Sequence, residues 1–258
     1  YFVWYTKVVK GAKLYPSGYD GTVWFATSSD GVKWKESGET IARGREGSWD
    51  EQSVFTPNVL SHDGHFYLYY TAVPKPFRNS APRITRTAIG VTSSDSPFGP
   101  WKKHRQNPIL EASWDYNDFD SLRVDDACLL VREDQVHLYY KGRAWNRQPS
   151  QTMMGVATSK SPLGPFEKHP GNPVVRGGHE VMVWPESGGV MSIHSNAGED
   201  GRSLQFSKNG KDFVRVSGQS VYPNAPGAFR QDNGLSWGIS MVHGPHPYLV
   251  RFDVKQPE

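Results

Sequence analysis

The sequence predicts an all-β fold, a five-bladed β-propeller that forms a single domain over residues 1–258. Residues 89–110 (IGVTSSDSPFGPWKKHRQNPIL) and 154–175 (MGVATSKSPLGPFEKHPGNPVV) are near-copies of each other, and weaker copies occur at 23–37 and 203–217. Self-similarity at a fixed period indicates repeated structural units. The chain length accommodates five units of about 45 to 55 residues, which an all-β fold commonly keeps in one domain.

Each copy contains the same series of expected strands. An alternating aromatic strand, YLYYTA at 67–72 or VHLYYKG at 136–142, leads to a second strand and then to a turn rich in Ser, Asp, Pro and Gly. Alternation with period two between Gly and Pro is typical of strands and turns, and no segment keeps a helical stripe. A fifth unit extends from about residue 221 through LSWGISM to YLVRFDV. Antiparallel units of this kind bury both faces by stacking radially, which predicts the propeller.

Composition limits the partners. The formal net charge is +3 and the basic residues are scattered, whereas a nucleic-acid surface clusters them on one face. No apolar run approaches the ~18 residues of a membrane span. We therefore expect no nucleic-acid and no membrane partner. The lone cysteine, Cys128, excludes a disulfide framework, and its place in the apolar run ACLLV predicts a buried thiol.

The chain opens at Tyr1 in YFVWYT, which is typical of the interior of a strand, and it carries neither an initiating Met nor a signal peptide. We expect a truncation at the N-terminus, with the loss of any targeting information. The localisation is unknown on this basis, with a periplasmic or secreted location slightly favoured.

Polar residues at the starts of the innermost strands line the channel of a propeller. Counting back from each aromatic strand places Thr56, Asp126 and His179 at equivalent positions. Glu180 is the alternative to His179, because a register shift of one residue exchanges the two. Asp125 has the same relation to Asp126. The noncatalytic alternatives are that His179 is a structural hydrogen-bonding residue and that Asp125 and Asp126 form a solvated turn.

The phrases SSDSPFGPW…NPIL and TSKSPLGPF…NPVV are similar to the third and fourth strands of the five-bladed propeller glycoside hydrolases around families 43, 32 and 117. This resemblance covers nearly the whole chain. Family 43 has a glutamate as general acid where this chain has His179. A histidine there, with an aspartate in the middle blade, resembles family 117, the exo-acting α-1,3-(3,6-anhydro-L-galactosidases) of agar breakdown. The segments FTPNVL at 55–60 and YKGRAWN at 140–146 also resemble that family.

The resemblance implies an inverting exo-glycosidase that acts on an oligosaccharide substrate, with His179 as general acid and Asp126 keeping it protonated and oriented. The water-activating base would be an aspartate on the innermost strand of blade one, about ten residues before Tyr1 by the repeat period. Asp50 or Glu51 could replace that base. The resemblance further implies a homodimer formed through an N-terminal arm, which would also precede Tyr1. A family 43-like arabinosidase or xylosidase and a noncatalytic sugar-binding propeller are the alternatives.

Two tryptophans, Trp49 and Trp145, break the repeat and lie in expected loops, so we predict that they bind the apolar face of a sugar. Arg123 and Arg143 flank the first two strands of the third blade, where a guanidinium group can hold hydroxyl, carboxylate or sulfate groups. The remaining residues of the expected substrate-binding set are Gln52, Thr56 and Glu180.

Other aromatic rings have a structural interpretation. Trp34, Trp101, Phe166 and Phe213 share one repeated position, so we expect them to pack between blades. His243 and His246 in MVHGPHP are separated by Gly and Pro, and no other cluster has metal-ligand spacing. No cofactor is predicted with certainty, and a metal ion in the channel stays open.

Overall fold

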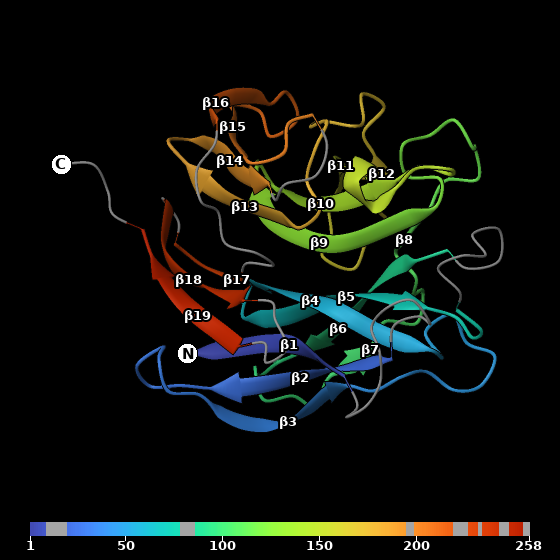
Figure 1. Cartoon of the computed structure of the whole chain (residues 1–258). Coiled ribbons are helices and arrows are strands. Elements are labelled where there is room, and N and C mark those ends of the chain that lie inside the picture. The colour runs from blue at the N-terminus through green and yellow to red at the C-terminus, as the bar shows by residue number, and fades with distance from the viewer. Residues whose placement is uncertain are drawn as a thin grey trace.

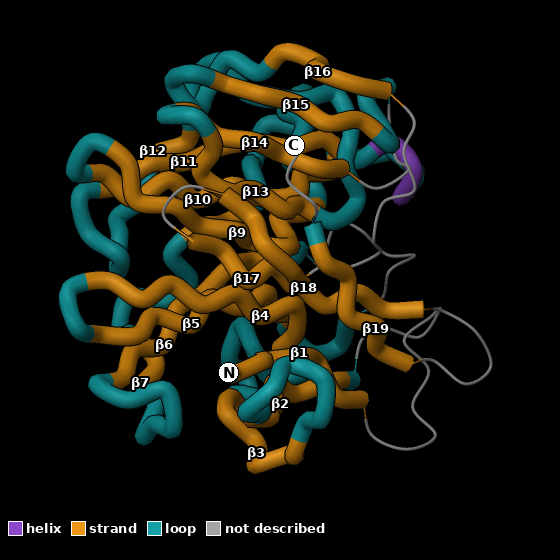
Figure 2. The backbone as a smooth tube through the Cα atoms, turned by 90° about the vertical axis from the view of Figure 1, so that its left-hand side faces the viewer, coloured by secondary structure: helices purple, strands orange, loops and turns teal. Residues whose placement is uncertain are grey.

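The computed structural model describes residues 1–8, 20–77, 86–194, 199–218, 227–231, 234–242 and 248–254. These residues form five antiparallel sheets and one short 3₁₀ turn, Pro149–Gln151. The sheets are arranged as a five-bladed β-propeller (Figure 1), which confirms the predicted fold. Figure 2 shows the same order after rotation, with the sheet that ends in β16 at one side of the molecule and the sheet that begins with β1 at the other.

Each sheet is one blade. Blade one contains β1 (Phe2–Val8), β2 (Gly21–Thr27) and β3 (Lys35–Ile41). Blade two contains β4 (Ser53–His62), β5 (His65–Val73), β6 (Ala88–Ser94), β7 (Lys102–Lys103) and β8 (Leu110–Glu111). Blade three contains β9 (Arg123–Arg132), β10 (Gln135–Arg143), β11 (Met153–Ser159) and β12 (Glu167–Lys168). Blade four contains β13 (Val181–Glu186), β14 (Gly189–His194), β15 (Ser203–Ser207) and β16 (Val214–Gly218). Blade five contains β17 (Gly227–Gln231), β18 (Gly234–Val242) and β19 (Tyr248–Asp253).

The innermost strands of four blades are β4, β9, β13 and β17, and each contacts the next around the channel. In blade one, β1 corresponds instead to a second strand, because YFVWYTKV aligns with FYLYYTAV of β5. The interblade contacts agree. The Thr56 amide donates to Thr6 Oγ1 on β1 at 2.9 Å, as the Asp126 amide donates to Thr71 Oγ1 on β5 at 3.3 Å. The described strands of blade one therefore occupy the second to fourth positions.

Aromatic rings pack between neighbouring blades in a repeated geometry. A ring on the second strand of one blade meets the edge of a ring from the outer hairpin of the next. The three pairs have centroid distances of 6.0, 6.4 and 6.0 Å and interplanar angles of 85°, 81° and 86°: Trp4 with Trp101, Tyr69 with Phe166, and Tyr139 with Phe213. The predicted structural role of the repeated ring is confirmed at these three positions.

Cys128 is buried, as predicted, with its sulfur 3.8 Å from the carbonyl oxygen of Val183 on the next innermost strand. In the part of the chain that the structure describes, no helix has the length and apolar character to cross a membrane.

Candidate active site

The innermost strands of blades two and three carry the same β-bulge. On β4, Thr56 and Pro57 lie opposite a single residue of β5, and on β9, Asp126 and Ala127 lie opposite a single residue of β10. Thr56 and Asp126 have φ angles of 46° and 53°, which residues with a side chain rarely adopt. A bulge bends the strand and redirects a side chain. The fold therefore holds these two predicted channel residues in equivalent, strained positions.

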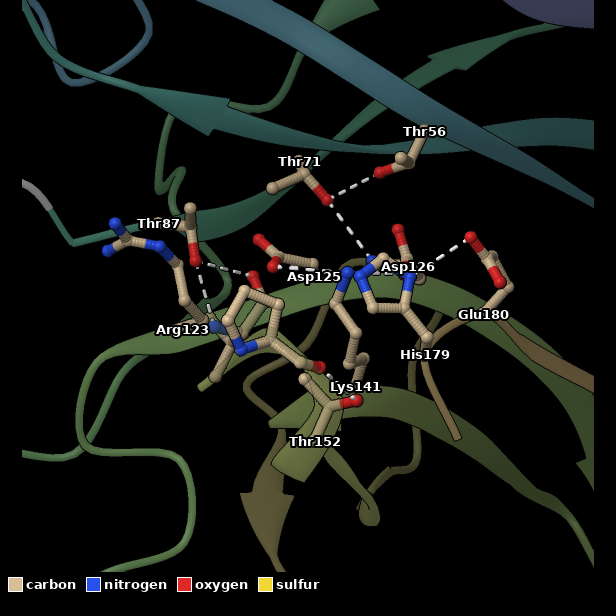
Figure 3. Close-up of polar contacts among 12 residues, drawn as sticks. Thr56, Thr71, Thr87, Arg123, Asp125, Asp126, Lys141, Thr152, His179 and Glu180 are labelled. Carbon is tan, nitrogen blue, oxygen red and sulfur yellow. Dashed lines mark hydrogen bonds and ion pairs between the residues drawn. The ribbon is translucent and has the colours of Figure 1, made fainter. Parts of the chain in front are cut away.

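A buried ion pair occupies the channel side of blade three. Lys141 on β10 places its Nζ 2.7 Å from Asp126 Oδ2 and 3.5 Å from Asp125 Oδ2. The three side chains are 9%, 11% and 9% exposed in that order. Figure 3 shows Lys141 reaching the pair from the neighbouring strand. One ammonium group thus balances two carboxylates, which leaves the cluster a formal charge of minus one when all three are ionised.

Burial and the neighbouring charged side chains determine the protonation of Asp126. Burial is the largest influence and raises the pKa of Asp126 above its ordinary value. The Lys141 ammonium lowers this pKa, and the Asp125 carboxylate raises it. Glu180 adds a further upward effect and His179 a downward one, with a net upward shift. Asp126 is therefore coupled electrostatically to the start of blade four.

A glycine brings His179 and Glu180 to this cluster. Gly178 has a φ of 110°, and a Cβ at this position would lie 2.6 Å from Nδ1 of the buried His194. Only glycine fits both the backbone conformation and the space. His179 Nδ1 then lies 3.0 Å from Glu180 Oε1. The His179 side chain is 41% exposed, so it is the member of the group most accessible to a ligand (Figure 3).

Blade two has a neutral pair where blade three has an ion pair. Thr56 Oγ1 and Thr71 Oγ1 are 2.7 Å apart. By alignment of β5 with β10, Thr71 corresponds to Lys141, and Thr56 corresponds to Asp126. The structure brings together four of the residues predicted from the sequence, namely Thr56, Asp126, His179 and Glu180. It adds Lys141, for which the sequence signal is the change from YYTA to YYKG between the two aromatic strands.

The two predicted sugar-binding arginines are buried. Arg123 and Arg143 are 3% and 8% exposed and pair with each other in the β9–β10 register. Arg123 donates from Nη1 to the Leu122 carbonyl at 3.1 Å, and its guanidinium lies 5.0 Å from the Phe77 ring centroid. In Figure 3 Arg123 lies on the side of Thr87. These contacts fix the start of blade three, and sugar binding by either arginine stays a prediction.

Trp49 does not break the repeat, which corrects one premise of its assignment as a sugar platform. Its ring stacks on Tyr70 at 5.7 Å and covers Gly90. Phe119 has the same relation to Tyr140 at 5.8 Å and covers Gly155 in blade three. The two segments were not matched in the sequence because the rings differ in type. Gln52, three residues along, is partly buried, and its backbone N–H donates to the Val73 carbonyl at 3.0 Å.

A second repeated feature, the linker clamp, explains Asp50. The clamp joins an aspartate before the innermost strand to a lysine, a tyrosine and an asparagine of the same blade. Lys103 Nζ lies 2.6 Å from Asp50 Oδ2 in blade two, and Lys168 Nζ lies 2.7 Å from Asp120 Oδ2 in blade three. The clamps consist of Asp50, Tyr70, Lys103 and Asn107, and of Asp120, Tyr140, Lys168 and Asn172. Glu51, the other alternative base, accepts a bond from the Gly47 amide at 2.7 Å. Both acids thus have local structural partners.

Trp145 lies at the start of the loop that follows β10 and is half-buried. Its amide donates to Ser121 Oγ at 2.9 Å, and its ring lies 5.6 Å from the Tyr116 ring. Tyr116 was not predicted, because it lies in a loop outside the repeat.

Metal binding finds little support among the described residues. Nowhere in the described ranges do three His, Cys, Asp or Glu side chains converge in a set that could hold a metal ion. Asp125 and Asp126 already share the Lys141 ammonium, which would repel a cation. His243 and His246 lie outside the described residues.

Comparison with known proteins places this chain among glycoside hydrolases. The family model for glycosyl hydrolases family 43 matches residues 15–154. A family 117 glycoside hydrolase produced by the marine bacterium Zobellia galactanivorans is 31% identical, with a TM-score of 0.81 over 98% of this chain and 80% of that chain.

More distant structures share the fold. An endo-arabinase from Bacteroides thetaiotaomicron is 14% identical, with a TM-score of 0.62 over 92% of this chain and 87% of its own. A sucrose-6-phosphate hydrolase from Lactobacillus gasseri is 12% identical, with a TM-score of 0.71 over 99% of this chain and 56% of its own. No curated protein sequence matches the chain.

Proposed function

The chain belongs to the five-bladed β-propeller glycoside hydrolases of the group that includes families 43 and 117, and on that premise we propose that it releases a terminal 3,6-anhydro-L-galactose, or a similar sugar, from agar-type oligosaccharides. The reaction proposed is an exo-acting hydrolysis with inversion. The observation that carries the proposal is the group formed by Asp126, Lys141 and His179, in which we assign the general acid to the histidine.

His179 is the proposed general acid. Imidazolium gives up its proton close to neutral pH, and it can protonate the glycosidic oxygen as the bond breaks. Its Nδ1 contacts the Glu180 carboxylate at 3.0 Å, which assigns the proton delivered to the substrate to Nε2. The contact with Glu180 also orients the ring.

Asp126 is the proposed modulator of that acid. A carboxylate beside an imidazole favours the protonated ring. Lys141 keeps Asp126 in place through the contact of 2.7 Å and offsets part of the cost of burying the charge. Inversion further requires a base that activates water on the opposite face of the sugar. The family resemblance assigns that base to the innermost strand of blade one, and the described strands of blade one are the second to fourth.

Two alternatives have specific grounds. The match to the family 43 model ends at residue 154, before His179, so an arabinosidase or xylosidase activity is supported by the scaffold from blade one to the start of β11 in blade three and not by the proposed acid. A noncatalytic sugar-binding propeller would keep the channel without a complete acid and base pair.

The direct test compares His179→Ala, Glu180→Ala and the unmodified protein on neoagaro-, arabino- and xylo-oligosaccharides, with the anomer of the product followed by NMR. We expect release of anhydrogalactose with inversion, and a loss of about a hundredfold or more in His179→Ala, the scale of general acid catalysis. Activity retained in His179→Ala but lost in Glu180→Ala would reassign the acid to Glu180. Release of pentoses, or binding with no hydrolysis of any sugar, would replace the proposal by one of the alternatives.

A further inference from the structure

Two exposed aromatic rings and one half-buried ring lie at the end of blade three where its channel strand begins. Trp114 and Tyr116 belong to the loop before β9, and Trp145 belongs to the loop after β10. We call these three rings, together with Arg86, the mouth platform. The two loops emerge side by side, since Arg123 pairs with Arg143 and the Leu122 amide donates to the Arg143 carbonyl at 2.9 Å.

Trp114 is exposed and yet held in place. It is 74% exposed, the highest value among the large hydrophobic side chains that the structure describes. The Arg86 guanidinium lies 3.7 Å from the centre of its ring, and Arg86 Nη1 donates to the Ser113 carbonyl at 2.8 Å. A cation over one face of an indole fixes the ring and leaves the other face to solvent. Such a flat apolar face matches the apolar face of a sugar ring.

The loop that carries Trp114 and Tyr116 is ordered by its own hydrogen bonds. The Asp115 amide donates to Ser113 Oγ at 3.1 Å, and the Asn117 amide donates to Asp115 Oδ1 at 2.9 Å. Ser121 closes the loop through its amide, which donates to the Asp118 carbonyl at 3.2 Å, and it also receives the Trp145 amide. A surface ordered before binding loses less conformational entropy when a ligand arrives.

The repeated architecture does not require these rings. The corresponding loop of blade two is also closed by a backbone hydrogen bond, from the Gly44 amide to the Asp50 carbonyl at 2.9 Å, as Ser113 bonds to Asp120 in blade three. Between these ends blade two has Arg45, Glu46 and Gly47, and its one aromatic ring is packed on Tyr70. Trp114 and Tyr116 are therefore additions to the frame, and large exposed apolar groups added to a rigid surface mark binding sites.

We propose that the mouth platform binds the sugar units of an oligosaccharide that lie beyond the terminal unit held at His179. This inference rests on the proposed function, because it takes the platform and the catalytic group as parts of one binding path. Both lie at the same end of blade three. Asp126 is the fourth residue of β9, and Trp114 and Trp145 are in the loops that precede β9 and follow β10. The platform then sets the preferred chain length and leaves the bond cleavage unchanged.

The test measures kcat and KM of the protein and its Trp114→Ala, Trp114→Phe and Tyr116→Ala variants on neoagarobiose, neoagarotetraose and neoagarohexaose. Phe98→Ala is the matched control. Phe98 is 66% exposed and follows β6, whose last residue, Ser94, pairs with Phe66. This end of blade two is opposite to the end at which β4 begins, where Ser53 pairs with Val73. All variants are first compared by thermal unfolding.

We expect Trp114→Ala to raise KM for the tetra- and hexasaccharide by about fivefold to tenfold, the scale of one aromatic contact, with kcat and the disaccharide KM unchanged. Trp114→Phe should keep most of the affinity, and Phe98→Ala should change no KM. Cleavage of the longer sugars with an unchanged KM in Trp114→Ala overturns the platform and leaves the proposed function intact.

If the neoagaro-sugars are not cleaved, binding of arabino- and xylo-oligosaccharides is titrated in the same variants. Length-dependent binding lost in Trp114→Ala would then support the platform while the proposed function fails, and binding independent of Trp114 would overturn both.

Discussion

Blades two and three have the same frame and different channel groups. Both contain a bulged innermost strand, a packed ring over a glycine and a linker clamp. At the two positions that face the channel, blade two has Thr56 and Thr71, 2.7 Å apart, and blade three has Asp126 and Lys141, also 2.7 Å apart. The chemistry of the channel therefore depends on two side chains placed on a repeated scaffold, as expected where function is a site added to a fold.

The sharpest test of this comparison converts the channel pair of blade three into that of blade two. In Asp126→Thr combined with Lys141→Thr, we expect the fold to remain and kcat/KM to fall by at least about a hundredfold, because the proton donor loses its modulator. Lys141→Thr alone should lower the free energy of unfolding by about 3 kcal/mol, since it leaves buried carboxylates without their cation. Chemical denaturation and steady-state kinetics measure both effects.

The double variant is its own control for folding. If the pair acts as a unit, the double variant is more stable than Lys141→Thr alone, because one buried carboxylate, that of Asp125, then lacks its cation instead of two. A double variant with full activity would show that the difference between the two blades has no catalytic meaning.

The linker clamps predict equal effects in the two blades. Asp50→Ala and Asp120→Ala should each lower the free energy of unfolding by about 2 kcal/mol, because each removes the carboxylate that the clamp's lysine and buried tyrosine hydroxyl both contact. Neither should change kcat by more than about twofold, because a loss of stability away from the proposed catalytic group lowers the fraction of folded protein and not the turnover of the folded molecules. Loss of turnover in a folded Asp50→Ala protein would instead restore Asp50 as a candidate for the water-activating base.

Asp126→Asn separates the charge of blade three from its shape. A general acid is active in its protonated form, so the rate falls as pH rises through the pKa of the acid. Removal of a negative charge next to the acid should move the alkaline limb of the kcat profile to lower pH. An alkaline limb at the same pH in the Asn variant would mean that Asp126 does not act on the proton donor.

The sequence was informative where the period repeats and less so where equivalent positions carry different types of side chain. Thr56 and Asp126 could be located by counting because each lies at a fixed distance from an aromatic strand. Lys141 does not follow from the same period, because it lies on the second strand while its partner Asp126 lies on the innermost one. The equivalence of Trp49 to Phe119 is visible only in the structure, where the two rings cover the equivalent glycines Gly90 and Gly155. Trp114 lies in a loop without a repeat, where exposure is decided by the tertiary fold.

The smallest expected difference between the blades concerns acid stability. His137 in blade three corresponds to Tyr67 in blade two, and burial lowers the pKa of His137 to about 4, with help from the charges of Lys211 and Arg132. In the unfolded chain a histidine titrates near ~6.5. Between these two values the unfolded state binds a proton that the folded state does not, so stability falls as pH drops from about 6.5 to about 4, by at most about 1.4 kcal/mol per pH unit for one histidine.

In His137→Gln the free energy of unfolding should depend less on pH across this window, as measured by urea denaturation at a series of pH values. His65→Gln, which removes an exposed histidine of blade two, is the control, and the two variants should differ in slope. Equal slopes in both variants would show that burial of His137 does not make blade three the more acid-sensitive of the two.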